Sequence, residues 1–264
     1  MKPFISISIL AIFAIASCQK EIDVDLNESN PILVLEANYS AKDSTVRAIV
    51  TLTSSFFNNE PSPNINSAVA TITDHLGNGT NVPSVGNGTY VLTNYIPTFG
   101  TTYTLTVVYD GVTYTAECDM NAPVTLDPIT YEFFPPFFGQ SGYAPYLNFQ
   151  DPAGDTNYYV VVLARNDTLW NNLSDLLTQD DALTDGNYVE RPLFSRDLYQ
   201  IGDKVGMELR TIDGDIYNYL NDVISTAGSG QSSAAPGNPD SNWDNGALGY
   251  FSCYSSSEQT VIIQ

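Results

Sequence analysis

Hydrophobic and polar residues alternate in short runs from Pro31 to Ala122. Six runs of five to eight residues are rich in β-branched and aromatic types, which favours β-strands. They cover residues 32–36, 46–53, 68–74, 89–93, 103–109 and 112–118. Asp110-Gly111, between the last two runs, is typical of a type I′ hairpin turn. The pattern predicts an immunoglobulin-like or transthyretin-like β-sandwich over residues 31–122.

Strand patterns return in the second half of the chain. Runs at residues 146–150, 158–164 and 205–211 predict strands, and runs at 249–254 and 260–263 predict terminal strands. Apolar residues recur at helical spacing in two places, which predicts a short surface helix within 169–183 and an amphipathic helix over 213–224. We therefore expect a mainly β chain whose second domain, residues 123–264, is β-rich with one or two short helices.

An aromatic segment separates these two regions of strands. It reads Tyr131-Glu-Phe-Phe-Pro-Pro-Phe-Phe-Gly-Gln-Ser-Gly-Tyr143, and its prolines and glycines exclude a regular central strand. One interpretation is an exposed loop that docks on a partner or stacks on sugar rings. Its binding aromatics would be Phe133, Phe134, Phe137, Phe138 and Tyr143. The other interpretation is a plug, with the rings buried between the two domains.

The N-terminus has the pattern of a lipoprotein signal peptide over residues 1–17. Its apolar run, residues 4–16, would be about 20 Å long as a helix, too short to cross a hydrocarbon core of about 30 Å. Ile15-Ala-Ser-Cys18 is the aliphatic, small, small, cysteine order that precedes lipoprotein cleavage. We expect cleavage before Cys18 and acyl chains on it that anchor the protein to outer-membrane lipid. The alternative is an ordinary secretory peptide.

Residues 18–30 form an acidic tether, with three acidic residues between Gln19 and Asp25. It resembles the signal that sends Bacteroidota lipoproteins through the outer membrane to the cell surface. The expected location is therefore the cell exterior, on a lipid anchor. A solvated linker on a protein that faces the periplasm is the alternative.

The charge of the chain narrows the class of partner. Against 30 acidic residues there are 9 basic ones, and loss of residues 1–17 with Lys2 takes the formal charge from −21 to −22. Phosphate backbones and anionic headgroups are unfavourable partners at this charge, so we expect no nucleic-acid binding. Cations, basic surfaces and neutral glycans remain compatible with it.

Two cysteines remain after Cys18 is acylated. A disulfide between Cys118 and Cys253 would close a loop of 134 intervening residues and contribute about 4 to 5 kcal/mol. If they lie too far apart, each is a small buried hydrophobic residue. With His75 as the one histidine, these cysteines make no zinc site.

The chain does not have the residues of a recognisable enzyme. A Ser–His mechanism would have to use His75, which lies in a predicted turn where a solvated side chain is the default. We expect no cofactor, with Ca²⁺ the one candidate ion. Asp151 with Asp155, and Asp213 with Asp215, offer oxygen ligands, although neither spacing matches an EF-hand loop.

Two short motifs resemble O-glycosylation sites. Asp43-Ser44-Thr45 and Asp167-Thr168-Leu169 resemble the acidic, hydroxyl, aliphatic tripeptide that Bacteroidota glycosylate. The predicted acceptors are Ser44 and Thr168.

Motifs of the second half carry a family resemblance. The runs 151–159, 193–199, 209–213 with 217–220, and 245–251 occur in the order seen in the Bacteroidota lipoprotein family called domain of unknown function 4249. Residues 100–107 and 110–116 fit it too. This chain departs from the family in the Gly/Ser-rich loop 227–242 and at Cys253, where a small residue is more usual. The resemblance implies an outer-membrane lipoprotein, commonly encoded beside a TonB-dependent transporter.

The sequence thus predicts a non-enzymatic accessory or binding partner of a TonB-dependent receptor. The tether would give it reach, and the second domain would contact the barrel or its cargo. The alternative is a glycan- or protein-binding adhesin that acts alone.

Overall fold

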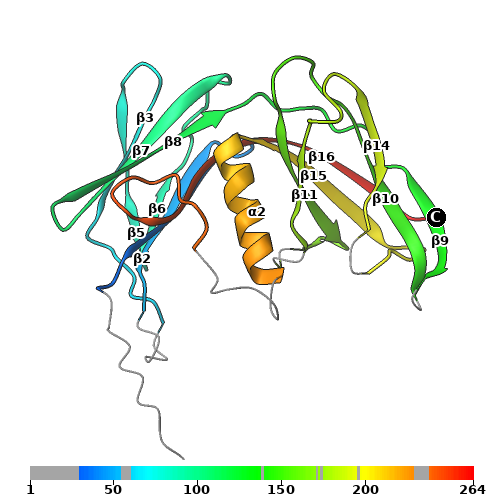
Figure 1. Ribbon diagram of the computed structural model, residues 1–264, viewed down its shortest axis with the longest axis horizontal. Helices are drawn as coiled ribbons and strands as arrows, with labels where there is room; N and C mark the ends of the chain where they lie inside the picture. The colour runs from blue at the N-terminus through cyan, green and yellow to red at the C-terminus, as the bar shows by residue number, and fades with distance from the viewer. Residues whose placement is uncertain are drawn as a thin grey trace, which may run out of the picture. The chain divides into compact units, whose positions relative to one another are not determined.

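The structure, a computed structural model, describes residues 30–54, 61–137, 140–170, 172, 175–194, 197–228 and 238–264. Residues Pro31–Gln264 form one compact unit, which is mainly β as predicted (Figure 1). Its helix among the described residues is α2 (Gly214–Gly228). In this part of the chain, helices fall short of the length and apolar character that a membrane span needs.

A first sandwich surrounds one hydrophobic core. One layer is half of a nine-stranded sheet, with β1 (Leu33–Ser40), β2 (Thr45–Leu52), β6 (Thr89–Leu92) and β5 (Ser84–Gly86). The other layer is a four-stranded sheet of β4 (Gly79–Val82), β3 (Val69–Thr73), β7 (Thr101–Tyr109) and β8 (Val112–Met120). Leu33, Leu35, Ala37 and Tyr39 are all buried because alternate residues of a strand face the same side.

The predicted hairpin between β7 and β8 is confirmed. Asp110 and Gly111 both have positive φ, 48° and 76°, as a type I′ turn requires. Tyr109 pairs with Val112 directly across the turn, and the register continues without a break to Thr101 and Met120.

A second sandwich surrounds a separate core. Its first layer is the other half of the nine-stranded sheet, with β11 (Tyr158–Arg165), β12 (Thr168–Leu169), β13 (Leu177–Asp180) and β15 (Lys204–Ile212). Its second layer is a three-stranded sheet of β14 (Tyr188–Pro192), β10 (Gln140–Gln150) and β9 (Tyr131–Phe137). Phe149, Tyr159, Tyr199 and Leu209 are fully buried between the layers.

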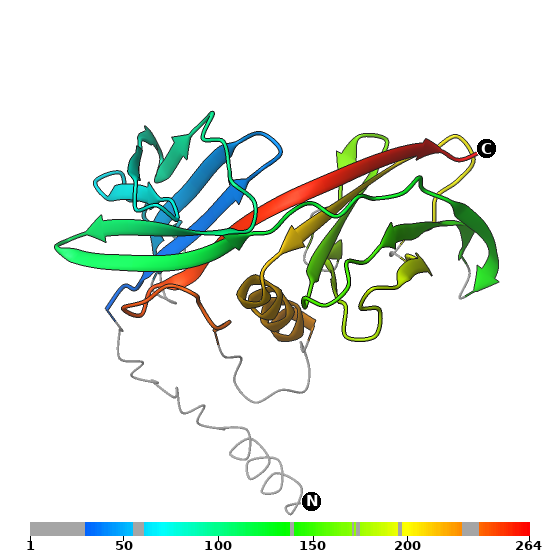
Figure 2. The ribbon, with the colours of Figure 1, turned by 90° about the horizontal axis from the view of Figure 1, so that it is seen from above.

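The last strand, β16 (Leu248–Ile262), belongs to both sandwiches. Its first seven residues pair in parallel with β1, and residues 255–262 pair antiparallel with β15. In Figures 1 and 2, β16 runs in red from the half that contains β1 and β2 to the half that contains β15. Phe251 enters the first core and Ile263 the second. The two terminal strands predicted at 249–254 and 260–263 are therefore one continuous strand.

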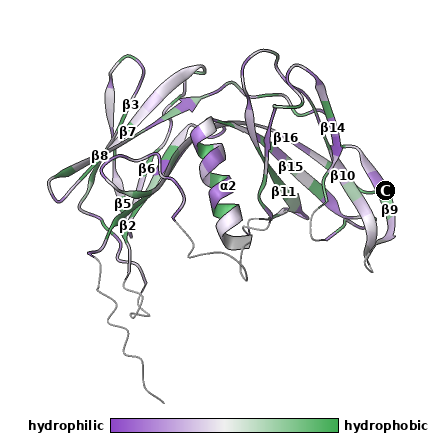
Figure 3. Ribbon diagram, in the orientation of Figure 1, coloured by the Kyte–Doolittle hydropathy of each residue, from purple (hydrophilic) through white to green (hydrophobic). Residues whose placement is uncertain are grey.

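The helix predicted at 213–224 is confirmed as α2. Asp213 caps it, because its carboxylate accepts the backbone N–H of Ile216 at 2.9 Å. Ile216 is buried against Val160 and Ile212, with Leu220 packed beside them. Bands of hydrophobic and hydrophilic colour alternate along α2 in Figure 3, as the amphipathic pattern predicts.

The surface helix predicted within 169–183 is wrong. Residues 177–180 form β13, which pairs antiparallel with β11. Leu176 packs against the core cluster under α2, whereas Leu177 packs into the second core. Neighbouring leucines that face opposite sides follow the period of a strand, which is about 2 residues. A short apolar run does not distinguish this period from the helical period of about 3.6 residues.

Candidate functional site

The aromatic segment forms a hairpin at one end of the second sandwich. β9 is the outer strand of its sheet, and β10 is the middle one. In Figures 1 and 2, both lie at the opposite end of the unit from β3, β7 and β8. An edge strand tolerates Pro135 and Pro136, which lack the N–H that a central strand needs. The predicted loop is therefore a hairpin. Its first part, with both prolines, is an edge strand, as the exclusion of a central strand predicts, whereas its last residues, from Gln140 to Tyr143, begin the middle strand β10.

Three rings form a cluster along one face of this hairpin. Tyr143 meets Tyr131 at 5.7 Å between ring centroids and Phe133 at 5.4 Å, both edge to face. Tyr131 and Tyr143 pack against the second core, whereas Phe133 is 52% exposed. The plug interpretation is wrong for these rings, because they line the second sandwich alone and Phe133 faces solvent.

Further apolar side chains at this end of the sandwich lie on the opposite face of β9, because neighbouring residues of a strand point to opposite sides. Phe134 meets Phe194 edge to face at 4.8 Å, and Phe194 is 58% exposed. Ile201, in the turn before β15, is 71% exposed. We call Phe133, Phe134, Phe194 and Ile201 the aromatic end. Several exposed apolar side chains at one end of a folded unit are typical of an interaction surface.

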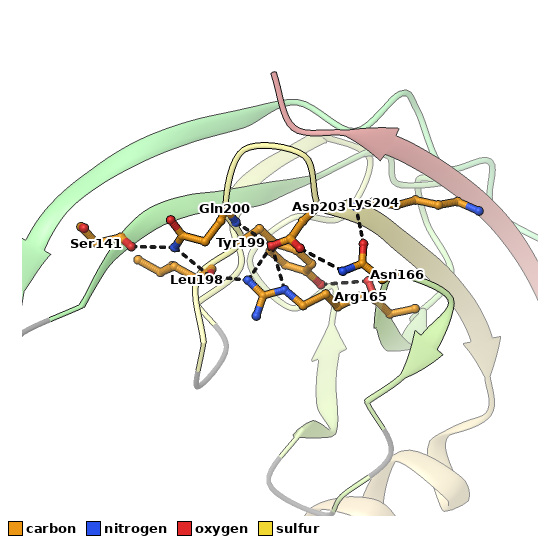
Figure 4. Close-up of polar contacts among 9 residues, drawn as sticks. Ser141, Arg165, Asn166, Leu198, Tyr199, Gln200, Asp203 and Lys204 are labelled. Carbon is orange, nitrogen blue, oxygen red and sulfur yellow. Dashed lines mark hydrogen bonds and ion pairs between the residues drawn. The ribbon is translucent and has the colours of Figure 1, made fainter.

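The segment after Phe194 is bonded to the tip of the hairpin. Tyr143 and Tyr199 exchange two backbone hydrogen bonds, at 2.8 and 2.9 Å. The side-chain amide of Gln200 donates to the carbonyl oxygen of Ser141 at 2.9 Å (Figure 4). Gly142 permits this approach, because a Cβ there would lie 2.6 Å from the carbonyl oxygen of Tyr199.

An ion pair between Arg165 and Asp203 also fixes this segment. Arg165 donates through Nε to Asp203 at 2.9 Å and through Nη2 to the carbonyl oxygen of Leu198 at 2.6 Å (Figure 4). Asp203 also accepts the Asn166 amide and the backbone N–H of Gln200. Burial raises the pKa of the Asp203 carboxyl, but the bonds from Gln200, Asn166 and Arg165 outweigh it, so that pKa lies below its ordinary value.

The lowered pKa of Asp203 gives a pH-dependent stability with a defined sign. In the unfolded chain, Asp203 is protonated below about pH 3.9. In the folded chain, it stays deprotonated down to a lower pH. This contribution is present above pH 3.9 and is lost as pH falls through the folded pKa. Asp203→Asn should lower the free energy of unfolding at pH 7 by about 1 to 3 kcal/mol. Urea unfolding of both proteins from pH 7 to 3 measures it; a gap that stays constant to pH 3 would contradict the assignment.

Stacked aromatic rings complete the frame. The Tyr199 ring lies on Trp170 at 5.2 Å with 20° between the planes, and the Arg165 guanidinium lies 5.0 Å from its centroid. The Tyr199 hydroxyl donates to the carbonyl oxygen of Ala164, and burial raises the pKa of that hydroxyl. The exposed side chains of the aromatic end therefore project from a backbone fixed by hydrogen bonds, an ion pair and ring stacking.

The outer face of the three-stranded sheet is acidic. The Tyr146 hydroxyl donates to Glu132 at 2.6 Å, and this bond raises the pKa of the hydroxyl. The Tyr188 hydroxyl donates to Asp127 at 3.0 Å, and Glu190 lies close to both tyrosines. Arg191, the next residue of β14, belongs to the opposite face because side chains alternate along a strand. A partner that covers this face would need basic or polar groups opposite these carboxylates.

A cluster of three carboxylates lies elsewhere in the second sandwich. Asp151, Asp181 and Asp185 each place one oxygen within 4.8 Å of the others, and the first two are buried. Asp151 accepts the Tyr159 hydroxyl at 2.6 Å, and Asp181 accepts the backbone N–H of Asn157 at 2.8 Å. Among the described residues, neither predicted calcium pair forms such a group. Calcium binding stays a prediction, which calorimetric titration with CaCl₂ tests.

The cysteines predicted to pair lie side by side. Cys118 and Cys253 are buried free thiols in the first core, and the Cys253 backbone N–H contacts the Cys118 sulfur. Cys118 also donates to the Asp213 carboxylate at 2.9 Å. Asp213, Cys118 and nearby Asp119 line a cavity of about 360 Å³ at the start of α2. Burial raises the pKa of both thiols and of the Asp213 carboxyl.

The remaining predicted site residues lie apart from the aromatic end. Ser44 is half-buried in the turn before β2, and Thr168 is exposed in β12. Their glycosylation stays a prediction. His75 is exposed in a turn, as expected. Cys18, the tether up to residue 29, Phe138 and the side chain of Phe137 lie outside the described residues.

Residues that complete the aromatic end escaped the sequence interpretation. Phe194 follows Leu193 and Ile201 stands alone between Gln200 and Gly202, and neither belongs to a periodic apolar pattern that would identify it. Arg165 is the last residue of a largely buried strand, and the sequence around it does not indicate its partner, Asp203, 38 residues later. The 193–199 motif was the available signal, because it contains both Phe194 and Tyr199.

Comparison with known sequences agrees with the motif order. The sequence model of the family described as "Domain of unknown function (DUF4249)" matches residues 19–260. A search of curated proteins finds no match. The family match includes strands of both sandwiches and most of β16, the strand that they share. The chain therefore belongs to the DUF4249 family.

Proposed function

We propose that this protein is an outer-membrane lipoprotein, anchored through acylated Cys18, that acts as a non-enzymatic accessory of a TonB-dependent transporter. The lipoprotein signal at residues 15–18 and the acidic tether support the anchor and the surface location. The partner rests on the resemblance of the sequence motifs to a family commonly encoded beside a TonB-dependent transporter. The aromatic end is the surface with which it docks.

The observation that carries this proposal is the exposure of the aromatic end on a rigid frame. Phe133, Phe194 and Ile201 are each more than half exposed. The backbone of the segment that contains Phe194 and Ile201 is nevertheless held by several hydrogen bonds. A fixed surface loses little conformational entropy when it binds, and buried aromatic residues contribute much of the energy of an interface. The hairpin is thus suited to a protein partner.

Charge and reach are consistent with a receptor as that partner. The acidic outer face beside the aromatic end disfavours an anionic membrane surface, so we expect docking on protein with basic or polar groups. The 12 residues from 19 to 30 span at most about 40 Å when extended. The folded unit can therefore stand clear of the lipid and still meet a neighbouring barrel.

Affinity capture tests the proposal. The double variant Phe133→Ser/Phe194→Ser should fold, because both side chains are largely exposed, and should recover at least ten-fold less TonB-dependent receptor from outer membranes. The matched control is Val85→Ser/Ile96→Ser, which changes two apolar residues of the first sandwich that are even more exposed than Phe133 and Phe194. This control should capture as much receptor as the unaltered protein.

Two outcomes would contradict the proposal. If the unaltered protein never recovers a TonB-dependent receptor, the partner is wrong. If both double variants lose the receptor equally, the docking surface is wrong. Binding of purified glycans without any receptor, lost on changing Phe133 and Phe194, would instead favour the adhesin that acts alone.

A further inference from the structure

The contact between Cys118 and Cys253 has the proximity that a disulfide needs. The Cys118 sulfur lies 2.5 Å from the backbone nitrogen of Cys253 and 4.0 Å from its carbonyl oxygen. With about 2.8 Å from Cα to sulfur and about 1.5 Å from N to Cα, the two Cα atoms are at most roughly 6.8 Å apart. Disulfides join Cα atoms between about 4.4 and 6.8 Å apart.

No other thiol of the mature chain competes for this pairing. The sequence has three cysteines, and acylation would occupy Cys18. Cys118 and Cys253 are 2% and 0% exposed, so a thiol of another molecule does not reach them in the folded protein. Each can therefore pair with the other alone.

We propose that the exported protein carries a disulfide between Cys118 and Cys253, which links β8 of the four-stranded sheet to β16, the strand shared by both sandwiches. This inference depends on the exported location in the proposed function, because disulfides persist in oxidising compartments. It is independent of any transporter. The bond links the two layers of the first sandwich through its core.

The reaction is an exchange with a thiol oxidase that carries a reactive disulfide. A sulfur–sulfur bond forms between Cys118 and Cys253, and the bond in the oxidase breaks. Two electrons and two protons pass from the cysteines to the oxidase, which leaves as a dithiol. Burial raises the pKa of both thiols, so the reactive thiolate is scarce once the sandwich has closed. The exchange therefore precedes closure, and the buried bond then resists reductants.

The loss of one hydrogen bond accompanies this change. The Cys118 thiol donates to the Asp213 carboxylate, and a disulfide sulfur has no proton to donate. Asp213 keeps the backbone N–H of Asp119 and that of Ile216 in α2. The N-terminus of the helix therefore stays capped in the oxidised protein.

Mass spectrometry of the full chain tests this proposal directly. The protein is purified from membranes without reductant, denatured with a maleimide and digested with trypsin. Cleavage after Arg165 and Arg210 places the two cysteines on separate peptides. We expect these peptides to be joined and unlabelled, and to separate and accept one label each after reduction. Maleimide on both peptides without reduction would overturn the disulfide. A label on the peptide with Cys18 reports separately that the lipid anchor is absent.

A thermal melt provides a second measurement. Reduction of the denatured protein, followed by refolding, should lower the melting temperature by roughly 10 °C, since the bond closes a long loop. The control is Cys118→Ala/Cys253→Ala, whose melting temperature should not respond to reductant. An equal response in both proteins would contradict a stabilising bond.

Discussion

Gly249→Ala is expected to lower the free energy of unfolding by about 3 to 5 kcal/mol. Gly249 lies at the start of β16, paired with Leu35 of β1, and has a φ of 100°. A side chain at such a positive φ costs about 1 to 3 kcal/mol. The added Cβ would also collide with the Leu35 peptide, whose carbonyl carbon would lie 2.8 Å away. Relief of that collision requires two buried strands to separate, which costs about 1 to 3 kcal/mol more.

Gly246→Ala is the matched control for this change. Gly246 also has a positive φ, 76°, but a Cβ there would meet no atom within 4 Å. We expect a loss of about 1 kcal/mol from backbone strain alone. Urea unfolding of both variants measures the difference. Equal losses would show that the close approach of β1 and β16 at Gly249 contributes nothing.

Tyr199→Ala is expected to lower the free energy of unfolding by about 3 to 5 kcal/mol and to loosen the aromatic end. The Tyr199 side chain is fully buried, so its loss leaves a cavity beside Trp170. The Arg165 guanidinium would lose the ring that it lies against. The alanine keeps the two backbone hydrogen bonds to Tyr143 but loses the ring that packs on Trp170 and Arg165 and fixes this segment, so receptor capture should fall even at temperatures where the variant is folded.

Tyr199→Phe separates packing from hydrogen bonding. It keeps the ring and removes the bond to the Ala164 carbonyl oxygen, so we expect a loss of about 0.5 to 1.5 kcal/mol and normal capture. Chemical denaturation and receptor capture are measured on the same preparations. If Tyr199→Ala captured receptor as well as the unaltered protein, the frame would have no part in docking.

Elements with strong local signals were predictable from the sequence. Asp110-Gly111 predicts its hairpin because few residue pairs tolerate two successive positive φ values. The α2 helix is predictable because its apolar residues recur over three turns and face one side of the sheet. Both signals lie within a few residues, and tertiary contacts reinforce them.

Elements decided by distant contacts were not predictable. β16 is interrupted by Ser255-Ser-Ser-Glu258, which reads as a turn, yet these residues pair with β15 while the strand passes from one core to the other. Leu177 lies in a strand, β13, because it pairs with Val161 of β11, 16 residues earlier. No local pattern contains either partner.

The candidate site was predictable only in part. Phe133, Phe134 and Tyr143 were identified because aromatic residues are conspicuous in a segment with prolines. Phe194 and Ile201 lie near them because Arg165, Asp203 and Tyr199 fix the intervening segment against the hairpin. The fold brings these three residues together from separate strands and turns (Figure 4). Whether a ring is exposed depends on the neighbouring sheet, which the segment itself does not specify.

Site-specific photo-crosslinking in intact cells tests most directly whether the aromatic end docks on a transporter. A photoreactive phenylalanine analogue replaces Phe194, and in a control protein it replaces Ile96, a more exposed residue of the first sandwich. On irradiation, the analogue at position 194 should link the protein to a TonB-dependent receptor of the outer membrane, whereas the analogue at position 96 should not. Receptor crosslinks from neither position, or equally from both, would contradict the account.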